Sequence, residues 1–382
     1  MDPRGGGPME GVLQLATQLN AFGHCSEAIT LDAPGQAFFK QFPGRVHALG
    51  PSRSSYRFNT RLVPWLRDRA QRYDAVIING LWQYHSFGVW RAMARMDVPY
   101  YVFPHGMLDP WFRRTYPYKH LKKCLYWPWA DYRVLRDARA VLFTSDEERR
   151  LASQSFALYR ANERVVSHGI STPPSDAERL RHVFLDRYPE LRGQRILLFL
   201  GRIHEKKGCD LLIRAFSSVL GTDTRLRLVM AGPDQTGWGS DLREIASALG
   251  IADRVTWPGM LHDDLKWGAL YCAEAFILPS HQENFGIAVA ESLACGVPVL
   301  ISDKVNIWRE IVAGGAGFVE SDDMPGTQRL LTAWLSLDKE AKRLMRESAV
   351  RTFERQFHVN VVARNLLGLM NESVNPAQHY KQ

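Results

Sequence analysis

Short apolar runs recur along the whole chain and alternate with amphipathic stretches, and this alternation constrains the fold more than any other feature. Strands that are apolar throughout, with helical segments between them, are typical of parallel sheets covered by helices on both faces. The sequence therefore predicts an α/β fold with parallel sheets. The runs lie at residues 27–33, 75–80, 100–104, 140–144, 164–167, 196–200, 226–231, 254–257, 275–279 and 299–302.

A proline-containing segment at residues 171–176 (STPPSD) divides this pattern into two halves. A chain of 382 residues is long enough for two domains that each bury a core, and this fits better than one large domain. We therefore expect one Rossmann-like domain over residues 1–172 and a second over residues 173–356. Apolar residues at helical spacing in residues 357–382 predict a last helix that packs back on the body.

The start of the chain departs from the usual order. A doubly wound domain normally begins with a central strand that leads into a glycine-rich turn and a helix. Here Gly5, Gly6 and Gly7 come first, and a helical segment follows directly from Met9. We expect that the first strand of the N-terminal domain is missing, and that an upstream start would supply it.

The net charge of +8 is distributed unequally. Residues 1–172 hold 23 Lys and Arg against 14 Asp and Glu, whereas residues 173–382 hold 25 against 26. A basic half beside a neutral half favours different ligands for the two halves over a uniformly basic protein that binds nucleic acid.

The cysteines and the hydropathy indicate the cellular compartment in which the protein works. The five cysteines are scattered, without a C-x-x-C pair, and no stretch approaches the ~20 apolar residues of a membrane span. We expect a protein of the reducing cytoplasm, either soluble or peripheral at the inner face of the cytoplasmic membrane.

The first candidate site follows the run at residues 196–200. The sequence GRIHEKKG at residues 201–208 places Arg202 and Lys207 beside the start of a helical segment. A diphosphate is bound well by two cations and the free amides of a helix N-terminus. A solvated basic turn would have the same composition, and this motif alone favours neither interpretation.

The second candidate site follows the run at residues 275–279. Glu283 precedes a helical segment that contains Glu291. Eight residues of continuous helix would separate the two by ~12 Å, which is too far for the carboxylate pair of a glycosidase. We therefore interpret both as hydrogen-bond acceptors for hydroxyl groups of one elongated ligand. The alternative is a helix-stabilising Glu283 and a surface Glu291.

Together these motifs resemble the retaining glycosyltransferases of family 4, which have the GT-B fold of two Rossmann-like domains facing a cleft. The resemblance rests on G-R-x4-K-G at residues 201–208 and, 75 residues later, on E-x7-E with an inner N-F-G. It extends over most of the chain through the N-terminal glycines, the His-Gly at residues 105–106, the S-H-G-I at residues 167–170 and the last helix.

The resemblance implies a nucleoside diphosphate sugar as donor, bound mainly by the second domain. The implied residues are Arg202, Lys207, Gly6 and Gly7 for the diphosphate; Glu283, Asn284, Phe285 and Gly286 for the sugar; Glu291 for the ribose; and Trp257, Gly259 and Met260 near the base.

His105 directly follows the run at residues 100–104, where ligands bind in open α/β sheets. A loop histidine alone is more often structural, but the resemblance implies that His105 faces the reacting sugar and is catalytic together with Glu283. It also implies that the departing phosphate accepts the acceptor's proton. The chain has no D-x-D and no Cys/His cluster with ligand spacing, so we expect no metal or other cofactor.

Residues 111–136 form the densest basic and aromatic segment of the chain. Such a composition is typical of a helix in an anionic membrane interface. Single-stranded nucleic acid would use similar groups, but no RNA-binding motif accompanies them, and a third alternative is that the aromatic residues are simply core. We expect a membrane or acceptor patch formed by Arg113, Arg114, Lys119, Lys122, Lys123 and Trp127.

The sequence therefore predicts a retaining hexosyltransferase that uses a nucleotide sugar. Its expected acceptor is a lipid-linked or polysaccharide glycan of the cell surface, with no nucleic-acid partner. One alternative is a nucleotide-sugar epimerase of the same fold, which would need no acceptor surface. The other is a non-catalytic module that binds a sugar nucleotide or a membrane.

Overall fold

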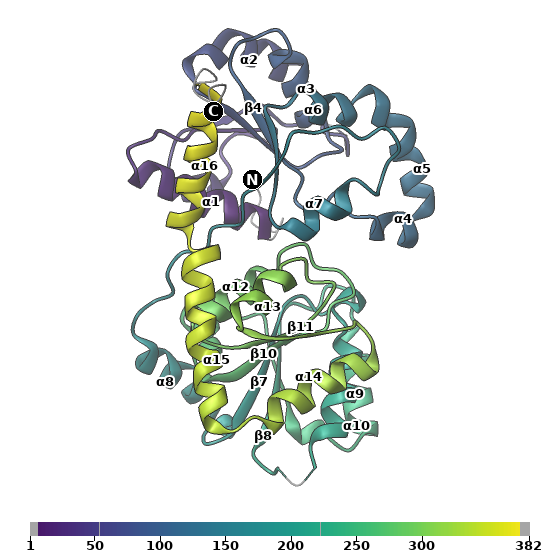
Figure 1. Cartoon of the computed structure of the whole chain (residues 1–382), viewed down its shortest axis with the longest axis vertical. Helices are drawn as coiled ribbons and strands as arrows, with labels where there is room; N and C mark the ends of the chain where they lie inside the picture. Colours follow the sequence, from purple (N-terminus) through teal and green to yellow (C-terminus); the bar gives the residue numbers. More distant parts are fainter. Residues whose placement is uncertain (1–6, 53, 222, 375–382) are drawn as a thin grey trace, which may run out of the picture. The chain divides into compact units, whose positions relative to one another are not determined.

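The computed structural model describes residues 7–52, 54–221 and 223–374 of the chain (Figure 1). The chain divides into two compact units. Unit 1 comprises Met1–Gly169 and Val359–Gln382, and unit 2 comprises Ile170–His358. None of the described helices is both long and apolar enough to cross a membrane.

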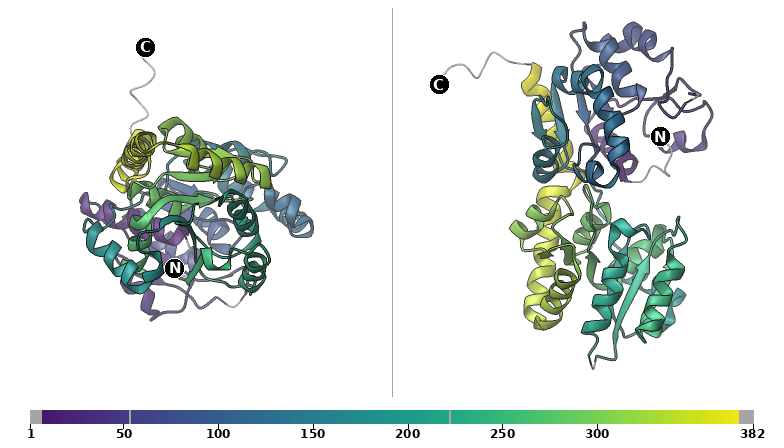
Figure 2. Two further views of the ribbon diagram at one scale, coloured as in Figure 1. Left: turned by 90° about the horizontal axis from the view of Figure 1, so that it is seen from below. Right: turned by 90° about the vertical axis from the view of Figure 1, so that its right-hand side faces the viewer.

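Unit 2 contains one six-stranded sheet in which every neighbouring pair of strands is parallel, in the order β12-β11-β10-β7-β8-β9. Helices lie on both sides of this sheet (Figure 2). The strands are β7 Arg195–Leu200, β8 Leu226–Ala231, β9 Val255–Gly259, β10 Ala273–Leu278, β11 Val299–Ser302 and β12 Gly317–Glu320. The helices are α8 Ala177–Arg187, α9 Cys209–Val219, α10 Gly239–Ala248, α11 Asp263–Cys272, α12 Ile287–Ala294, α13 Trp308–Gly314, α14 Met324–Ser336 and α15 Lys339–Thr352.

Unit 1 contains a four-stranded parallel sheet, β3-β4-β5-β6, and a separate parallel pair, β1 and β2. The strands are β1 Ala28–Thr30, β2 Val46–Ala48, β3 Val76–Asn79, β4 Tyr100–Phe103, β5 Ala140–Phe143 and β6 Glu163–Val165. The helices are α1 Gly7–Ala21, α2 Leu62–Arg69, α3 Tyr84–Met93, α4 Trp111–Thr115, α5 Pro117–Tyr126, α6 Asp131–Asp137, α7 Asp146–Ala152 and α16 Val359–Val374.

Both faces of the four-stranded sheet are buried, because successive strand residues point to opposite faces. On β4, Tyr100 and Val102 join the apolar cluster that includes α2, α3 and α6. Tyr101 and Phe103 join a second cluster with residues of α1 and α16. Two units with parallel sheets and apolar strands confirm the predicted α/β class.

The first described element is α1, and β1 comes only after it. Gly5 and Gly6 lie outside the described residues, so the structure does not bear on their predicted role, whereas Gly7 is the first residue of α1.

The chain passes from unit 1 to unit 2 at Gly169 and Ile170, three residues before the expected boundary. Ile170 donates a backbone hydrogen bond to the carbonyl of Phe357 (2.8 Å). A Cβ atom on Gly169 would lie 2.9 Å from Cα of Val359, so the outgoing and returning segments run side by side here. The return to unit 1 follows His358, two residues later than the sequence suggested.

Candidate functional site

The loops after β7 and β10 meet at the carboxyl edge of the sheet in unit 2. The amide of His281 donates to the carbonyl of Lys206 (2.8 Å). Gly208 has a φ of 64° and directly precedes α9, and a Cβ there would lie 2.3 Å from the carbonyl oxygen of Pro279. Only glycine satisfies both the left-handed backbone and this close approach, so the G-R-x4-K-G spacing ties the two loops together.

Lys207 and Glu283 form an ion pair across these loops. Lys207 is only 8% exposed, and Glu283 is half-buried. Burial and the nearby charges of Lys206 and Arg202 lower the pKa of Lys207 to about 7. A bound polyanion would favour the charged ammonium, so this buried lysine is suited to a ligand that brings negative charge.

Backbone bonds fix the loop that carries Glu283. The amide of Glu283 donates to the carbonyl of Lys304 (2.9 Å), and the amide of Asn306 donates to the carbonyl of Glu283 (3.0 Å). Gly286 has a φ of 79° and precedes α12, which begins only at Ile287. As the sequence indicated, Glu283 lies in the loop before α12 and Glu291 lies within the helix, so the ~12 Å separation of a continuous helix does not apply to this pair.

The remaining residues of this segment have different environments. The side chain of Phe285 is buried and packs edge-on against Phe357 (5.5 Å between ring centroids), so it belongs to the core of unit 2. Asn284 accepts a hydrogen bond from Asn306 (3.5 Å). Glu291 is 5% exposed and accepts a hydrogen bond from Nζ of Lys266 on α11 (2.8 Å).

The predicted base-proximal residues lie at the end of the edge strand β9. Gly259 has a φ of 72°, and its carbonyl accepts a hydrogen bond from Gly232 (2.8 Å). Met260 is exposed, and the guanidinium of Arg243 lies 5.0 Å from the ring centroid of Trp257. The loops after β7, β8 and β9 thus line one edge of the same sheet.

In unit 1, His105 follows β4 and has a φ of 51°. Its Nε2 lies 2.9 Å from Oδ1 of Asn79, at the end of β3. Its ring stacks between Phe103 (5.5 Å) and His168 (5.2 Å), and its buried Nδ1 has no partner among the described residues. This nitrogen is a polar group for which the described part of unit 1 supplies no hydrogen bond.

Glu148 on α7 fixes the backbone beside His105. Its carboxylate accepts hydrogen bonds from the amide of Gly106 (2.5 Å) and from the amide and hydroxyl of Thr144 (2.7 and 2.6 Å). Glu148 is 3% exposed. Glu148 was not predicted as a site residue, because nothing in its local sequence distinguishes it from the neighbouring glutamate of the same helix.

Burial keeps both stacked histidines neutral near pH 7. It lowers the pKa of His168 to about 4, and together with the adjacent His168 it lowers the pKa of His105 well below its usual range. His105 is therefore suited to hydrogen bonding rather than to carrying a positive charge.

We expect the free energy of unfolding to fall as the pH drops from 6.5 to about 4. In that window His168 takes up a proton in the unfolded chain but not in the native one, which costs about 3 kcal/mol in total. Denaturant unfolding across this range should show a shallower pH dependence in His168→Gln. His24→Gln, at an exposed position of unit 1, is the control; equal slopes in both variants would contradict the assignment.

The predicted basic and aromatic patch differs from expectation at one residue. Trp127 is 2% exposed, donates from its indole nitrogen to the carbonyl of Leu158 (3.0 Å) and stacks on Phe156 (4.5 Å). Trp127 is therefore part of the core of unit 1, where it packs against aromatic side chains, and not part of an exposed patch. Lys123 is half-buried with its ammonium 4.3 Å from the ring centroid of Trp82, whereas Arg113, Arg114, Lys119 and Lys122 are exposed.

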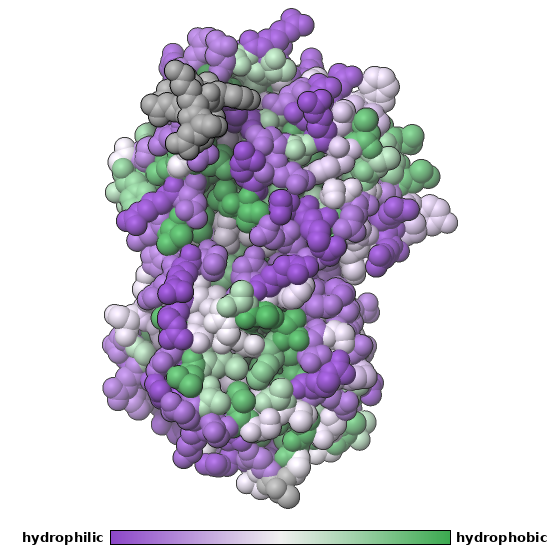
Figure 3. Space-filling view, viewed as in Figure 1, coloured by the Kyte–Doolittle hydropathy of each residue, from purple (hydrophilic) through white to green (hydrophobic). Residues whose placement is uncertain are grey.

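α5 instead turns apolar side chains outward. Tyr118, Leu121 and Leu125 are 85%, 62% and 73% exposed. Their spacing of three and four residues places them on one face of the helix. Together with Trp129, which is 69% exposed, they form what we call the α5 stripe. Figure 3 shows hydrophobic residues gathered over this region.

Among the described residues, no group of three or more His, Cys, Asp or Glu side chains is arranged to hold a metal ion.

Two family models match the chain. "Glycosyl transferase 4-like domain" matches residues 6–169, and "Glycosyl transferases group 1" matches residues 185–351. Curated relatives include the D-inositol 3-phosphate glycosyltransferases of Streptosporangium roseum (33% identical over 150 residues, 37% of this chain and 34% of the relative) and Thermomonospora curvata (29% over 234 residues, 56% and 52%). The matched segments thus span about a third to a half of the length of these relatives.

Solved structures resemble the chain over nearly all of its length. Anabaena HepE in complex with UDP has a TM-score of 0.77 at 17% identity and covers 97% of both chains. WaaG, a glycosyltransferase involved in lipopolysaccharide biosynthesis, has a TM-score of 0.62 at 17% identity and covers 98% of this chain and 96% of its own. At such identities the likeness shows the fold, which is the predicted GT-B fold.

Proposed function

Because the chain belongs to the family 4-like glycosyltransferases of GT-B fold, we propose that it transfers a hexose from a nucleoside diphosphate sugar to a glycan acceptor. The observation that carries this proposal is the buried ion pair of Lys207 and Glu283 beside the N-terminus of α9. It places a cation for the diphosphate and a carboxylate for sugar hydroxyls within one hydrogen bond of each other.

The donor is assigned to unit 2. Lys207 and the exposed Arg202 would neutralise the diphosphate and stabilise it as the leaving group, which is the charge that a metal ion supplies in other transferases. Glu283 would bind the sugar. The buried Glu291 would bind the ribose with its carboxylate, which also accepts a hydrogen bond from Lys266. We propose no metal for this reaction.

We propose that the reaction retains the anomeric configuration. The family resemblance supports this. The pairing of Glu283 with Lys207 makes Glu283 a binding group rather than a free nucleophile, so the proposed retention does not proceed through a covalent intermediate at Glu283. His105, neutral and with Nδ1 unpaired among the described residues, would hydrogen-bond to the donor sugar near its reacting carbon. NMR assignment of the anomeric proton in the product tests retention; inversion would contradict it.

A panel of UDP-, GDP- and ADP-sugars tests the donor assignment. We expect one nucleotide class to raise the melting temperature, because a ligand that binds only the native state stabilises it by an amount that grows with the logarithm of its concentration relative to Kd. Glu283→Gln should reduce that shift in melting temperature. The control is Glu244→Gln, at an exposed position of unit 2. Glu274 is unsuitable as a control, because its carboxylate accepts a hydrogen bond from Arg195 in the fold. If no nucleotide sugar stabilised the protein, the donor assignment would fail.

The acceptor is proposed to be a lipid-linked or growing surface glycan at an anionic membrane. The α5 stripe supports this, because a helix of a water-soluble unit normally faces its apolar side inward. Here Lys123 faces Trp82, and His120 stacks on Phe156, so polar side chains occupy the inner side. An apolar face flanked by Lys119 and Lys122 matches an interfacial helix on acidic lipid.

We expect Leu121→Asp/Leu125→Asp to abolish flotation with liposomes that contain acidic phosphatidylglycerol. Both side chains are exposed, so the fold should tolerate the change, whereas burial in the lipid interface would be lost. Leu344→Asp, at a 47% exposed leucine of α15, is the matched control. The proposal would be contradicted if the wild type floated equally with neutral and acidic liposomes. It would also be contradicted if the double variant floated with acidic liposomes as well as the wild type does.

A further inference from the structure

A cavity of about 170 Å³ opens in unit 1 at the carboxyl ends of β1 and β2. Leu31 and Asp32 follow β1, and Pro51 and Ser52 lie beyond the end of β2. Ligands of open α/β sheets bind at this edge of the strands. The cavity is smaller than the ~300–1,000 Å³ of drug-sized ligand sites, so it is suited to one small ring rather than to a nucleotide.

The polar groups of the cavity are arranged around one ion pair. Asp32 bonds the guanidinium of Arg57, and Nε of Arg57 donates to Oγ of Ser52 (3.3 Å). Thr30 also donates its hydroxyl to the carboxylate of Asp32 (2.6 Å). A guanidinium has five N–H donors, and these contacts use two of them, so Arg57 keeps donors for a ligand.

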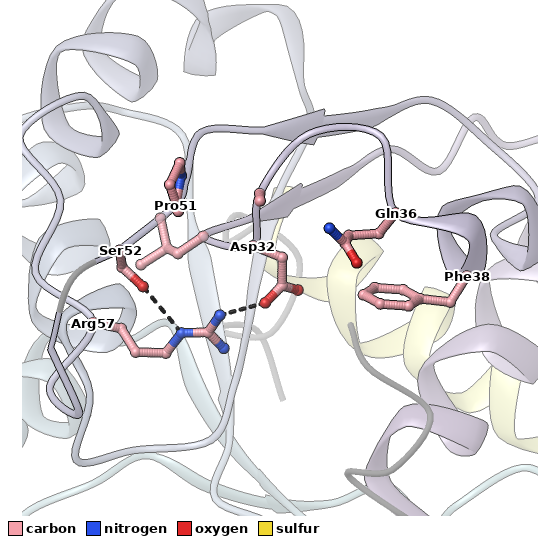
Figure 4. Close-up of a pocket in the computed structure, with 8 residues that line it drawn as sticks. Asp32, Gln36, Phe38, Pro51, Ser52 and Arg57 are labelled. Carbon is pink, nitrogen blue, oxygen red and sulfur yellow. Dashed lines mark hydrogen bonds and ion pairs between the residues drawn. The ribbon is translucent and has the colours of Figure 1, made fainter.

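A half-buried aromatic side chain and an amide complete the cavity. In Figure 4, Asp32 lies between Arg57 on one side and Gln36 and Phe38 on the other. A sugar ring offers hydroxyls at its rim and C–H groups on its face. The carboxylate, guanidinium and amide can bind the hydroxyls, and Phe38 can cover the apolar face.

The segment that carries Arg57 also contacts the elements of the proposed acceptor surface. The carbonyl of Tyr56 accepts a hydrogen bond from the amide of Tyr84, the first residue of α3 (2.8 Å). The hydroxyls of Tyr56 and Tyr126 lie 2.5 Å apart, and Tyr126 is the last residue of α5. The cavity is therefore linked through one residue to the helix that carries the α5 stripe.

We propose that this cavity binds an uncharged, hydroxylated six-membered ring, a sugar or a cyclitol, as the acceptor's ring. The inference rests on the proposed transferase function, since it names the acceptor class. Arg57 is paired with Asp32, and a phosphate beside that carboxylate would be repelled, so we expect an uncharged ring to bind in preference to a phosphorylated one.

Saturation-transfer NMR tests the proposal with glucose, galactose, mannose and myo-inositol, and with glucose 6-phosphate as the charged probe. We expect transfer to at least one uncharged ring and less to the phosphate. Phe38→Ala should remove the transfer, and Phe87→Ala on α3, also half-buried but outside the cavity lining, should retain it.

Asp32→Asn tests the charge argument separately. It leaves the guanidinium of Arg57 unpaired, so glucose 6-phosphate should gain signal while the uncharged rings lose it. Asp68→Asn, at an exposed ion pair of α2, is the control. Circular dichroism checks that each variant is folded. If Asp32→Asn does not fold, Phe38→Ala still tests the proposal.

The outcomes separate this inference from the proposed function. Donor stabilisation without transfer to any uncharged ring overturns the cavity assignment and leaves the transferase proposal standing. Transfer that neither Phe38→Ala nor Asp32→Asn changes, or a wild-type preference for glucose 6-phosphate, also overturns it. Transfer without donor stabilisation would support the cavity as a sugar site and contradict the donor assignment.

Discussion

Replacing Lys207 with alanine is expected to lower kcat/KM for sugar transfer by about 10²–10³-fold. Lys207 is the buried cation at the helix N-terminus where the diphosphate is proposed to bind, and it is paired with Glu283. Its removal takes away charge that would stabilise the leaving diphosphate, and it leaves the carboxylate of Glu283 without its cation. Steady-state transfer with the donor found in the thermal-shift panel measures the effect.

Lys206→Ala is the matched control for this variant. Lys206 is adjacent and loses the same charge, but its structural contact to His281 is made by its backbone carbonyl, which alanine keeps. Glu283→Gln and the double variant complete a cycle in which coupling of the two residues should exceed 1 kcal/mol, about the size expected for contacting residues. Equal losses in Lys206→Ala and Lys207→Ala, or additive effects of Lys207 and Glu283, would contradict the assigned roles.

The strands that the sequence predicted best are those buried on both faces. The runs at residues 226–231 and 299–302 coincide with β8 and β11, and that at residues 196–200 differs from β7 by one residue. Their patterns are clear because nearly every side chain of these strands is apolar, with Arg195, Arg227 and Ser302 as the exceptions. β2 and β12 were missed, since no residue of either is fully buried and their apolar signal is weak.

The sequence indicated the position of the donor loops but not their pairing. Glycine, lysine and glutamate spacing pointed to Lys207 and Glu283 separately, whereas their ion pair depends on how the loops after β7 and β10 cross. Lys266, which bonds Glu291, lies on another helix and has no motif of its own. Trp127 was predicted to be exposed but is buried. Composition alone cannot distinguish an interfacial tryptophan from a core tryptophan, because it does not show which way the segment faces.

The second large effect is expected for Glu148→Gln, which should lower kcat by about 10²-fold with little change in the KM for the donor. Glu148 lies in unit 1, where it accepts hydrogen bonds from Gly106 and Thr144 and so holds the turn that follows His105. A glutamine amide has one acceptor oxygen where the carboxylate has two, so one buried N–H would lose its partner or the turn would shift.

Glu147→Gln separates positioning from general destabilisation. Glu147 lies on the same helix and is 5% exposed, but its carboxylate bonds Arg150 on the helix itself. If Glu148 acts through His105, both variants should bind donor alike in thermal shifts while only Glu148→Gln loses turnover, because the donor is proposed to bind unit 2 and turnover is proposed to need the His105 ring in place as well. Glu148→Asp, which keeps the charge but shortens the side chain by one methylene, should restore little of the lost turnover. The three hydrogen bonds of 2.5–2.7 Å are already short, and the shorter side chain would not reach all three donors. A parallel loss of turnover in Glu147→Gln, or a Glu148→Gln enzyme with normal kcat, would show that the turn after β4 does not depend on this carboxylate.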